Sequence, residues 1–286
     1  MATLAAVAVM ASQSTWARRS ELGTDQAQAQ IMVRAGIDWT RAVLSDDRRL
    51  SNVDHLGEPW ALRLPPIPLE KGSVEGYIED QQGLFNLNNV VSDGKANVQQ
   101  LVRYRRLLAL LSLPPQLADT LVDWIDADSE PISASGAEDS YYSALASPYL
   151  AANRTLSDFD ELELIRGYDA NVIARLKPFV SILPPGTAVN TNTARAEVLA
   201  AVVDGLELAD ARTLVAQRDR IYFRDVSEFM RQLPAQATVD RESVAVSSDY
   251  FTATLRAELG GAEARGSVLL ARKTTSWPTI VRGKYL

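Results

Sequence analysis

The stretch AQAQIMVRAGIDWTRAV, residues 27–43, decides the fold. Its apolar residues recur at every fourth position, namely Ala27, Ile31, Ala35, Trp39 and Val43. This spacing marks one face of an α-helix. No proline and only two glycines occur from Thr3 to about Asp46, so we predict one helix over residues 1–46. At about 1.5 Å per residue this helix would be roughly 60 Å long, longer than a compact domain is wide, and its front half should project.

Residues 1–11, at the start of this helix, are apolar and uncharged. A membrane-spanning helix needs about 20 apolar residues, and a signal peptide needs a positive region that is absent here. The segment is therefore either the end of a longer apolar helix or a short packed segment. In either case we expect the chain as given to be soluble.

Extended segments flank the middle of the chain on both sides. Residues 60–64 precede Pro65-Pro66. Residues 73–80 have the alternating pattern of a strand, with Val74 and Ile78 on one face. Near the C-terminus, residues 251–259 alternate apolar and polar side chains before Gly260-Gly261, and residues 265–272 and 279–285 are predicted as further strands. One antiparallel sheet packed on the N-terminal helix would bury both sets of apolar strand faces.

The region between these strands has a helical pattern. We therefore predict an α+β protein with an N-terminal helix (1–46), a discontinuous sheet domain (47–84 and 241–286) and an inserted helical domain (85–240). Inside the helical domain, LNN (87–89) is followed by ADTLV (118–122), and VNTN (189–192) by ARTLV (211–215). Two related helical hairpins, each with a turn between its helices at Pro114-Pro115 or at Asp204-Gly205, would explain the similarity of these two segments. Chance similarity would explain it as well.

Composition excludes several classes of function. The net charge of −7 and the pI near 4.9 oppose binding to nucleic acid or to anionic lipid. The chain has no cysteine, which excludes disulfides, Cys-ligated zinc and thiol catalysis. It has a single histidine, His55, so no site can contain two His ligands. We interpret His55 as a loop residue.

The negative charge is concentrated in one segment. No Lys or Arg occurs from Leu107 to Asn153, whereas this segment holds seven carboxylates: Asp119, Asp123, Asp126, Asp128, Glu130, Glu138 and Asp139. Crowded carboxylates without counter-charge stay solvated, raise their pKa values or bind a cation. The loop is rich in Ser, Pro and Gly and could offer the flexible oxygen ligands that calcium prefers. By pattern alone, a solvated acidic loop is the more frequent outcome.

Signals for catalysis are weaker. SDGK (92–95) matches a Ser-x-x-Lys pattern without its companion motifs, and we interpret it as a turn. Paired carboxylates such as Asp126 and Asp128 could hydrolyse glycosides, which keeps a periplasmic hydrolase as an alternative. Residues 190–220 resemble a helix-hairpin-helix module, which keeps a nucleic-acid-binding protein as another. Asp204 and Glu207 flank its turn and oppose phosphate binding. We predict that the protein is not an enzyme.

Several strings together resemble the K-type minor pseudopilins of type II secretion. They occur in the family's order and cover nearly the whole chain: ED (79–80) with GLFNLN (83–88), DWIDAD (123–128) with GAED (136–139), YY (141–142), PY (148–149), NR (153–154), and VNTNTA (189–194) with EVL (197–199). The resemblance implies the pseudopilin fold, in which a long N-terminal helix packs on a small antiparallel sheet and a helical domain is inserted between strands.

The same resemblance implies a structural role at the tip of the pseudopilus, with I-type and J-type minor pseudopilins as partners, and other pseudopilins and secreted substrates as further contacts. It implies calcium in the helical domain, with Asp126, Asp128, Glu138 and Asp139 as candidate ligands. It also implies inner-membrane attachment through the N-terminal helix of the full-length precursor, with a periplasmic head. The basic leader and the full apolar helix of family precursors are not found in this sequence, so residues 1–11 would be the end of that helix.

Overall fold

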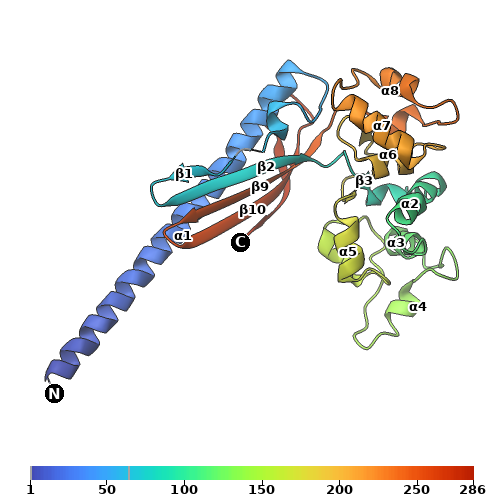
Figure 1. The fold of residues 1–286 in the computed structure, drawn as a ribbon. Coiled ribbons are helices and arrows are strands. Elements are labelled where there is room, and N and C mark those ends of the chain that lie inside the picture. Colours follow the sequence, from blue (N-terminus) through green and yellow to red (C-terminus); the bar gives the residue numbers. More distant parts are fainter. Residues whose placement is uncertain (1, 64) are drawn as a thin grey trace. The chain divides into compact units, whose positions relative to one another are not determined.

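The computed structural model describes residues 2–63 and 65–286, with side chains described from Trp16 onward except for Ala17 and Leu64. The chain forms two compact units (Figure 1). A sheet unit comprises residues up to 52, 57–79 and 249–286, and a helical unit comprises residues 53–56 and 80–248. Each unit has its own hydrophobic core. The α+β prediction with a helical insertion between strands is confirmed.

Helix α1 (Ala2–Leu50) confirms the predicted leading helix. At about 1.5 Å per residue it is roughly 70 Å long, and its N-terminal half extends beyond the sheet (Figure 1). The face that packs on strands β9 (Tyr250–Leu259) and β10 (Ala262–Ala271) carries Ala29, Val33, Ile37 and Leu44, each at most 2% exposed.

This packed face is not the face that the four-residue spacing marked. Ile31 is 60% exposed and Trp39 is 57% exposed. Helix α1 therefore carries two apolar faces, because 3.6 residues per turn places residues 33 and 37 on a different side from residues 31 and 39. Within the described residues, the sheet covers the face that carries Val33 and Ile37, whereas the face that carries Ile31 and Trp39 is exposed except at its last member, Val43, which packs against the core.

The sheet contains β1 (Ile67–Leu69), β2 (Gly72–Asp80), β9, β10 and β11 (Thr279–Tyr285), in the order β1-β2-β9-β10-β11. Strands from before and after the helical insertion therefore share one sheet. In β9 the odd-numbered residues 251–259 are buried and the even-numbered ones are more exposed, as the alternation predicted. The β9–β10 hairpin turns at Gly260 and Gly261, whose φ values of 54° and 90° favour glycine.

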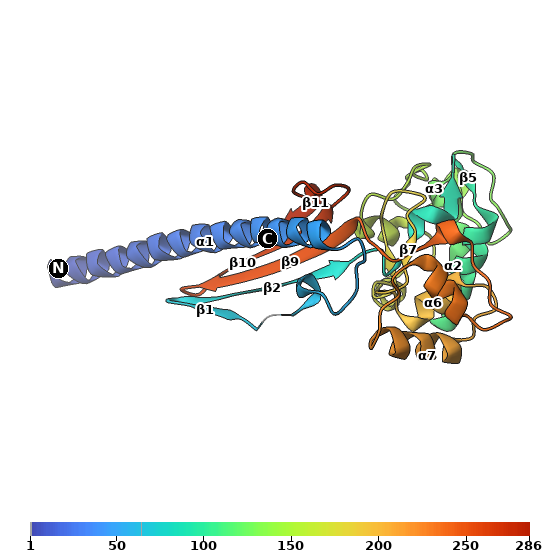
Figure 2. The ribbon, with the colours of Figure 1, turned by 90° about the horizontal axis from the view of Figure 1, so that it is seen from above.

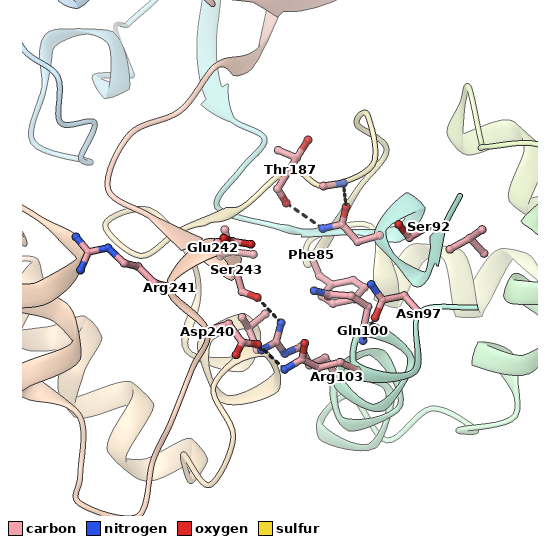
Figure 3. A pocket seen from close by; sticks show the side chains of 16 residues that line it. Phe85, Ser92, Asn97, Gln100, Arg103, Thr187, Asp240, Arg241, Glu242 and Ser243 are labelled. Carbon is pink, nitrogen blue, oxygen red and sulfur yellow. Dashed lines mark hydrogen bonds and ion pairs between the residues drawn. The ribbon is translucent and has the colours of Figure 1, made fainter. Parts of the chain in front are cut away.

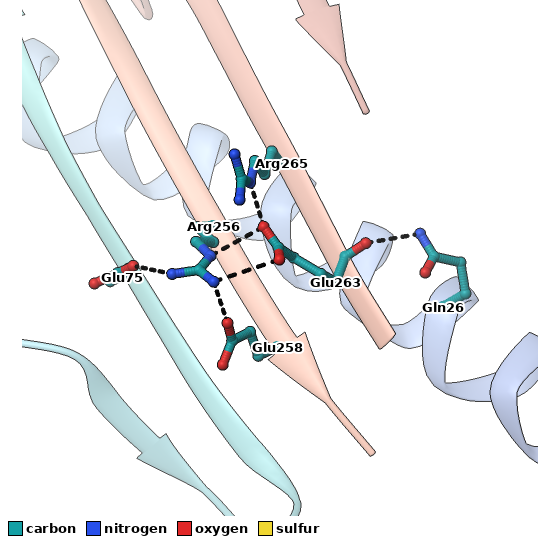
Figure 4. Close-up of polar contacts among 6 residues, drawn as sticks. All are labelled: Gln26, Glu75, Arg256, Glu258, Glu263 and Arg265. Carbon is teal, nitrogen blue, oxygen red and sulfur yellow. Dashed lines mark hydrogen bonds and ion pairs between the residues drawn. The ribbon is translucent and has the colours of Figure 1, made fainter. Parts of the chain in front are cut away.

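Charged residues cross-link the sheet on the face away from α1 (Figure 4). Arg256 of β9 contacts Glu75 of β2 at 3.3 Å and Glu263 of β10 at 3.0 Å, and it also pairs with Glu258. Exposed ion pairs contribute little individually, but this network joins three neighbouring strands. The network is compatible with the pairing register of these strands, which the alternation of apolar and polar residues establishes.

The strand predicted for residues 60–64 is wrong for the described residues 60–63, and Leu64 lies outside the described part of the chain. Residues Pro59–Ala61 form a 3-10 turn. Pro59 favours this turn because its φ is fixed and it has no N–H to donate to a sheet. Trp60 then packs edge-on against Phe251, with its Nε1 donating to Glu58 at 2.8 Å.

The helical unit consists of short elements joined by ordered loops: β3 (Phe85–Asn86), β4 (Val91–Ser92), β5 (Lys95–Ala96), α2 (Val98–Leu110), α3 (Leu117–Ile125), α4 (Asp139–Tyr142), α5 (Ala170–Leu176), β6 (Val180–Ser181), β7 (Val189–Asn190), α6 (Ala196–Val202), α7 (Leu208–Arg218), α8 (Val226–Gln232) and β8 (Val244–Ala245). The turn predicted at residues 92–95 connects β4 and β5, with Asp93 and Gly94 at positive φ. Two parallel bridges, β3–β6 and β7–β8, hold the unit together.

Candidate functional site

The acidic segment folds back onto the end of α3 because Asp123 holds it there. Its Oδ1 accepts a hydrogen bond from the Ile132 backbone at 2.9 Å, and its Oδ2 accepts one from Ala137 at 2.7 Å. Asp123 is fully buried. A Cβ atom at Gly136 would lie 2.0 Å from the same Oδ2, so only glycine fits this close approach. One carboxylate thus closes the loop and aligns the residues on either side of it.

This closure brings Glu138 back to Asp126 and Asp128, which lie ten or more residues earlier in the sequence. Oxygen atoms of Asp126, Asp128 and Glu138 lie within 4.8 Å of one another. Asp126 is 4% exposed and Glu138 is 1% exposed, whereas Asp128 is exposed. Within the described protein, Oδ1 of Asp126 and both carboxylate oxygens of Glu138 are buried without a hydrogen-bond partner. Buried polar atoms are normally paired, so these three oxygens are available to coordinate a cation.

The electrostatics of the cluster agree with this interpretation. Burial, and then repulsion from Asp128 and Asp123, raises the pKa of Asp126 to about 7. Burial, with repulsion from Asp123 and Asp126, likewise raises the pKa of Glu138 to about 7. Burial also raises the pKa of Asp123, partly offset by its two backbone hydrogen bonds. A bound cation would remove this penalty, because it stabilises the deprotonated carboxylates.

The other carboxylates of the segment have different roles. Asp119 lies against Arg105 at 2.5 Å and accepts from the Ser133 hydroxyl at 2.6 Å, so its charge is balanced from outside the segment. Asp139 does not belong to the three-carboxylate group, although the sequence predicted it as a fourth ligand. It begins α4 and accepts a hydrogen bond from Ala151 at 2.9 Å, which anchors the following loop. Glu130 is exposed.

The residues present fit a hard divalent cation. Their donors are carboxylate oxygens, without any His or Cys, and this set suits calcium or magnesium rather than zinc. An aromatic cluster lies beneath the segment, where Trp124 packs edge-on against Tyr142 at 5.2 Å and Tyr142 stacks on Tyr149.

A second candidate site is the uncovered apolar face of α1. Met32 and Trp39 are exposed and line a groove of about 360 Å³, and Ile31 is exposed on α1 one helical turn before Ala35, another residue of the lining. Leu62 and Ile67, which are 58% and 55% exposed, line the opposite wall of this groove. Large contiguous apolar surfaces on soluble proteins mark interaction sites. We call this region, Ile31, Met32, Trp39, Leu62 and Ile67, the apolar face.

The helical unit also contains a polar cavity of about 550 Å³ (Figure 3). Buried Arg103 lies at its wall, donating to the Ser243 hydroxyl at 2.7 Å and pairing with Asp240 at 3.1 Å. Amide side chains such as Asn97 and Gln100 complete the lining. A serine that accepts from an arginine is not activated as a nucleophile, so this cavity does not support the hydrolase alternative.

The turn between α6 and α7 uses its own backbone donors. The N–H of Asp204 donates to Thr238 at 2.8 Å, and the N–H of Leu206 donates to Val203. The Asp204 carboxylate pairs with Arg106 at 2.9 Å. A phosphate-binding turn needs free backbone N–H groups and a positive potential. Here the N–H groups of Asp204 and Leu206 are already bonded within the protein, so neither can donate to a phosphate.

Between Ala2 and Leu286, leaving aside residue 64, no helix combines the length and the apolar character that crossing a membrane requires.

Comparison with known proteins gives consistent results. Two sequence models of the family described as type II secretion system (T2SS), protein K match residues 83–185 and 189–248. The chain is 35% identical to type II secretion system protein K of Pseudomonas aeruginosa, over 93% of this chain and 82% of that protein. It is 33% identical to the corresponding protein of Aeromonas hydrophila, over 79% of this chain and 75% of that one.

A solved structure is also similar. It is the crystal structure of the GspK–GspI–GspJ complex from the type 2 secretion system of enterotoxigenic Escherichia coli. One chain of that complex aligns with a TM-score of 0.81 and 26% identity, over 94% of this chain and 99% of that chain.

Proposed function

This chain belongs to the type II secretion system protein K family and is a minor pseudopilin, and we propose that it caps the pseudopilus by binding I-type and J-type minor pseudopilins through the apolar face of α1. In this role it is a structural subunit of protein export rather than an enzyme.

The exposed apolar face is the observation that carries this proposal. A surface helix normally exposes one polar side, but α1 exposes Ile31 and Trp39, and Trp39 lines a groove together with Leu62 and Ile67. Burying one such large side chain contributes roughly 1.5–3 kcal/mol. A second apolar helix laid against α1 would cover both the helix face and the groove, which fits a partner with its own long pseudopilin helix.

The architecture also suits a terminal subunit. Pseudopilin helices would pack side by side, with α1 among them and its head carrying an inserted unit of residues 53–56 and 80–248. A head enlarged in this way obstructs the addition of a further subunit beyond it. We place the head in the periplasm, attached to the inner membrane through the helix of the full-length protein.

Calcium binding is a second part of the proposal. Asp126, Asp128 and Glu138 would hold the ion, and Asp123 would position the loop that carries them. The ion would neutralise buried carboxylates that no described side chain of the cluster neutralises. It would thereby stabilise residues 126–139 of the helical unit rather than perform chemistry.

Association with the partners tests the proposal directly. We expect the wild-type chain to co-elute with purified I-type and J-type head domains at micromolar concentration. Trp39→Glu should weaken this association at least tenfold, because it places a charge on the apolar face. Ile221→Glu, at a residue that is 71% exposed in the helical unit, is the matched control and should bind normally. Equal binding by both variants, or no complex with the wild type, would contradict the proposal.

A further inference from the structure

The polar cavity of the helical unit is assembled from segments that are far apart in sequence. Its volume of about 550 Å³ lies within the range of small-ligand sites. The lining comes from residues 85–92, the first turns of α2 (97–103), residues 186–189, Val202 of α6 and residues 240–243. Figure 2 shows α2 and α6 side by side in this unit. All of these segments belong to the helical unit, so the cavity is a different surface from the apolar face of the sheet unit.

The charges around the cavity balance one another. Its lining carries two basic side chains, Arg103 and Arg241, and two acidic ones, Asp240 and Glu242. Buried Arg103 pairs with Asp240 at 3.1 Å. An anion in the cavity would meet the two carboxylates and a cation would meet the two guanidinium groups, so neither gains an unopposed attraction. This balance, in a chain of net charge −7, favours an uncharged ligand.

Side-chain amides at the start of α2 have unused hydrogen-bonding capacity. The Oδ1 of Asn97 accepts from the backbone N–H of Gln100 at 3.2 Å, and both side chains line the cavity (Figure 3). Among the described residues, the amide nitrogen of Asn97 and the whole side-chain amide of Gln100 have no protein partner. The Ser243 hydroxyl accepts from Arg103, and its own proton is donated to no described residue. The cavity therefore presents both donors and acceptors, which the backbone of a peptide requires.

The rest of the lining favours a peptide over a sugar. Val91, Val189 and Val202, each at most 5% exposed, give the cavity an apolar part. Phe85 also lines the cavity, but it is 1% exposed and stacks on Tyr104, so it has no open ring face on which a sugar could stack. Amide groups beside an apolar lining suit a segment whose backbone is hydrogen-bonded and whose apolar side chain is buried.

We propose that this cavity binds a short, extended and uncharged peptide segment of another protein. Peptide groups of the segment would bond to Asn97, Gln100 and Ser243, and an apolar side chain would contact the valine residues of the lining. Two sources share this chemistry, namely a protein that the system exports and a partner pseudopilin. The choice between these sources rests on the proposed function, whereas the binding of the peptide does not.

Isothermal calorimetry with defined probes tests the site. The main probe is a tetrapeptide of alternating valine and asparagine with acetyl and amide ends. We expect the wild-type chain to bind it at least tenfold more tightly than tetrapeptides in which aspartate or lysine replaces asparagine, and at least tenfold more tightly than maltotriose. No binding of the uncharged peptide at millimolar concentration, or equal binding of all four probes, would overturn the proposal.

Two pairs of variants locate the bound peptide. Gln100→Leu should weaken binding of the uncharged probe at least tenfold, whereas Gln116→Leu, at an exposed glutamine outside the cavity, should bind normally. Ser92→Trp, at an exposed residue of the lining, should fill the cavity and abolish binding, whereas Ser147→Trp, exposed elsewhere, should not. Circular dichroism checks that all four variants are folded. Normal binding by both cavity variants would show that the peptide binds elsewhere, against the proposal.

Competition separates the two sources. If a complex with I-type and J-type head domains excludes the probe from the cavity, the segment belongs to a partner pseudopilin. If the complex still binds the probe, a protein that the same system exports should displace it. If the probe binds but no complex with the head domains forms, the proposed assembly is wrong while the assignment of the cavity stands.

Discussion

Asn88 and Asn192 hold equivalent places in the two halves of the helical unit, because each side-chain amide both donates to and accepts from the backbone of a single distant residue. Asn88 accepts from Leu156 N at 2.8 Å and donates to Leu156 O at 3.0 Å. Asn192 accepts from Phe223 N at 2.8 Å and donates to Phe223 O at 2.9 Å.

The surroundings of the two clamps also correspond. An Asp follows each clamped residue two positions later and caps the next helical turn, at Asp158 and at Asp225. Two related hairpins explain these shared contacts better than chance does. One difference between the halves is that the acidic segment fills the interval between α3 and Leu156, whereas α7 and Phe223 are joined by a short turn.

Removing either clamp should destabilise the protein. Asn88→Ala or Asn192→Ala leaves a buried N–H and a buried carbonyl unpaired, which costs about 2–4 kcal/mol. Asn171→Ala, at an exposed residue of α5, is the control and should change the free energy of unfolding by less than about 0.5 kcal/mol. Urea unfolding followed by circular dichroism measures the difference. A loss below about 0.5 kcal/mol for both clamp variants would show that the clamps are not structural.

Glu138→Gln should abolish calcium binding. It keeps the size of the side chain but removes the charge of the most deeply buried member of the cluster. Isothermal calorimetry with calcium and with magnesium should show selective calcium binding to the wild type and to the control Glu163→Gln, which changes an exposed glutamate outside the segment. Weak, equal heats for all three proteins and both ions would show that the segment is a solvated acidic loop without a specific calcium site.

The metal-free protein should lose stability as the pH rises. The pKa values of Asp126 and Glu138 increase from their ordinary 3.8 and 4.5 to about 7 because these groups are buried. Between about pH 4 and 7 the folded chain therefore binds more protons than the unfolded chain, and the free energy of unfolding falls across this window. Burial also raises the pKa of Asp80 to about 6, which adds to the same trend.

Thermal melts with a chelator at pH 5 and pH 8 measure this effect. We expect a smaller decrease in Tm for Asp126→Asn combined with Glu138→Gln, in which Asp80 still titrates. Added calcium should raise the Tm of the wild type more at pH 8 than at pH 5, because the ion binds the deprotonated carboxylates. A calcium effect that is independent of pH would argue against these ligands.

Glycine 136 should not tolerate a side chain. Gly136→Ala places a Cβ about 2 Å from Asp123 Oδ2, which must break a hydrogen bond that closes the acidic segment. We expect lower stability and loss of calcium binding. Gly23→Ala is the control, because no atom lies within 4 Å of its Cβ and alanine favours the helix, by about 0.5–1 kcal/mol. Calorimetric binding and urea unfolding of the two variants give the comparison.

The sequence alone determined those helices, strands and turns that depend on residues close together in the chain. The long α1, the alternation in β9, the Gly260-Gly261 hairpin and the turn at residues 92–95 could all be predicted, because period and turn chemistry depend on near neighbours. The unbalanced charge of residues 107–153 was equally visible in the sequence.

Only the tertiary structure decided which face of α1 is buried and which carboxylates converge. Ile31 and Val33 are equally apolar, and contact with β9 and β10 alone separates the exposed residue from the buried one. Asp126 meets Glu138, and Asp139 does not join them, because Asp123 binds the backbone of Ile132 and Ala137 and thereby sets the path of the loop. These outcomes depend on contacts between residues distant in sequence, which no local pattern records.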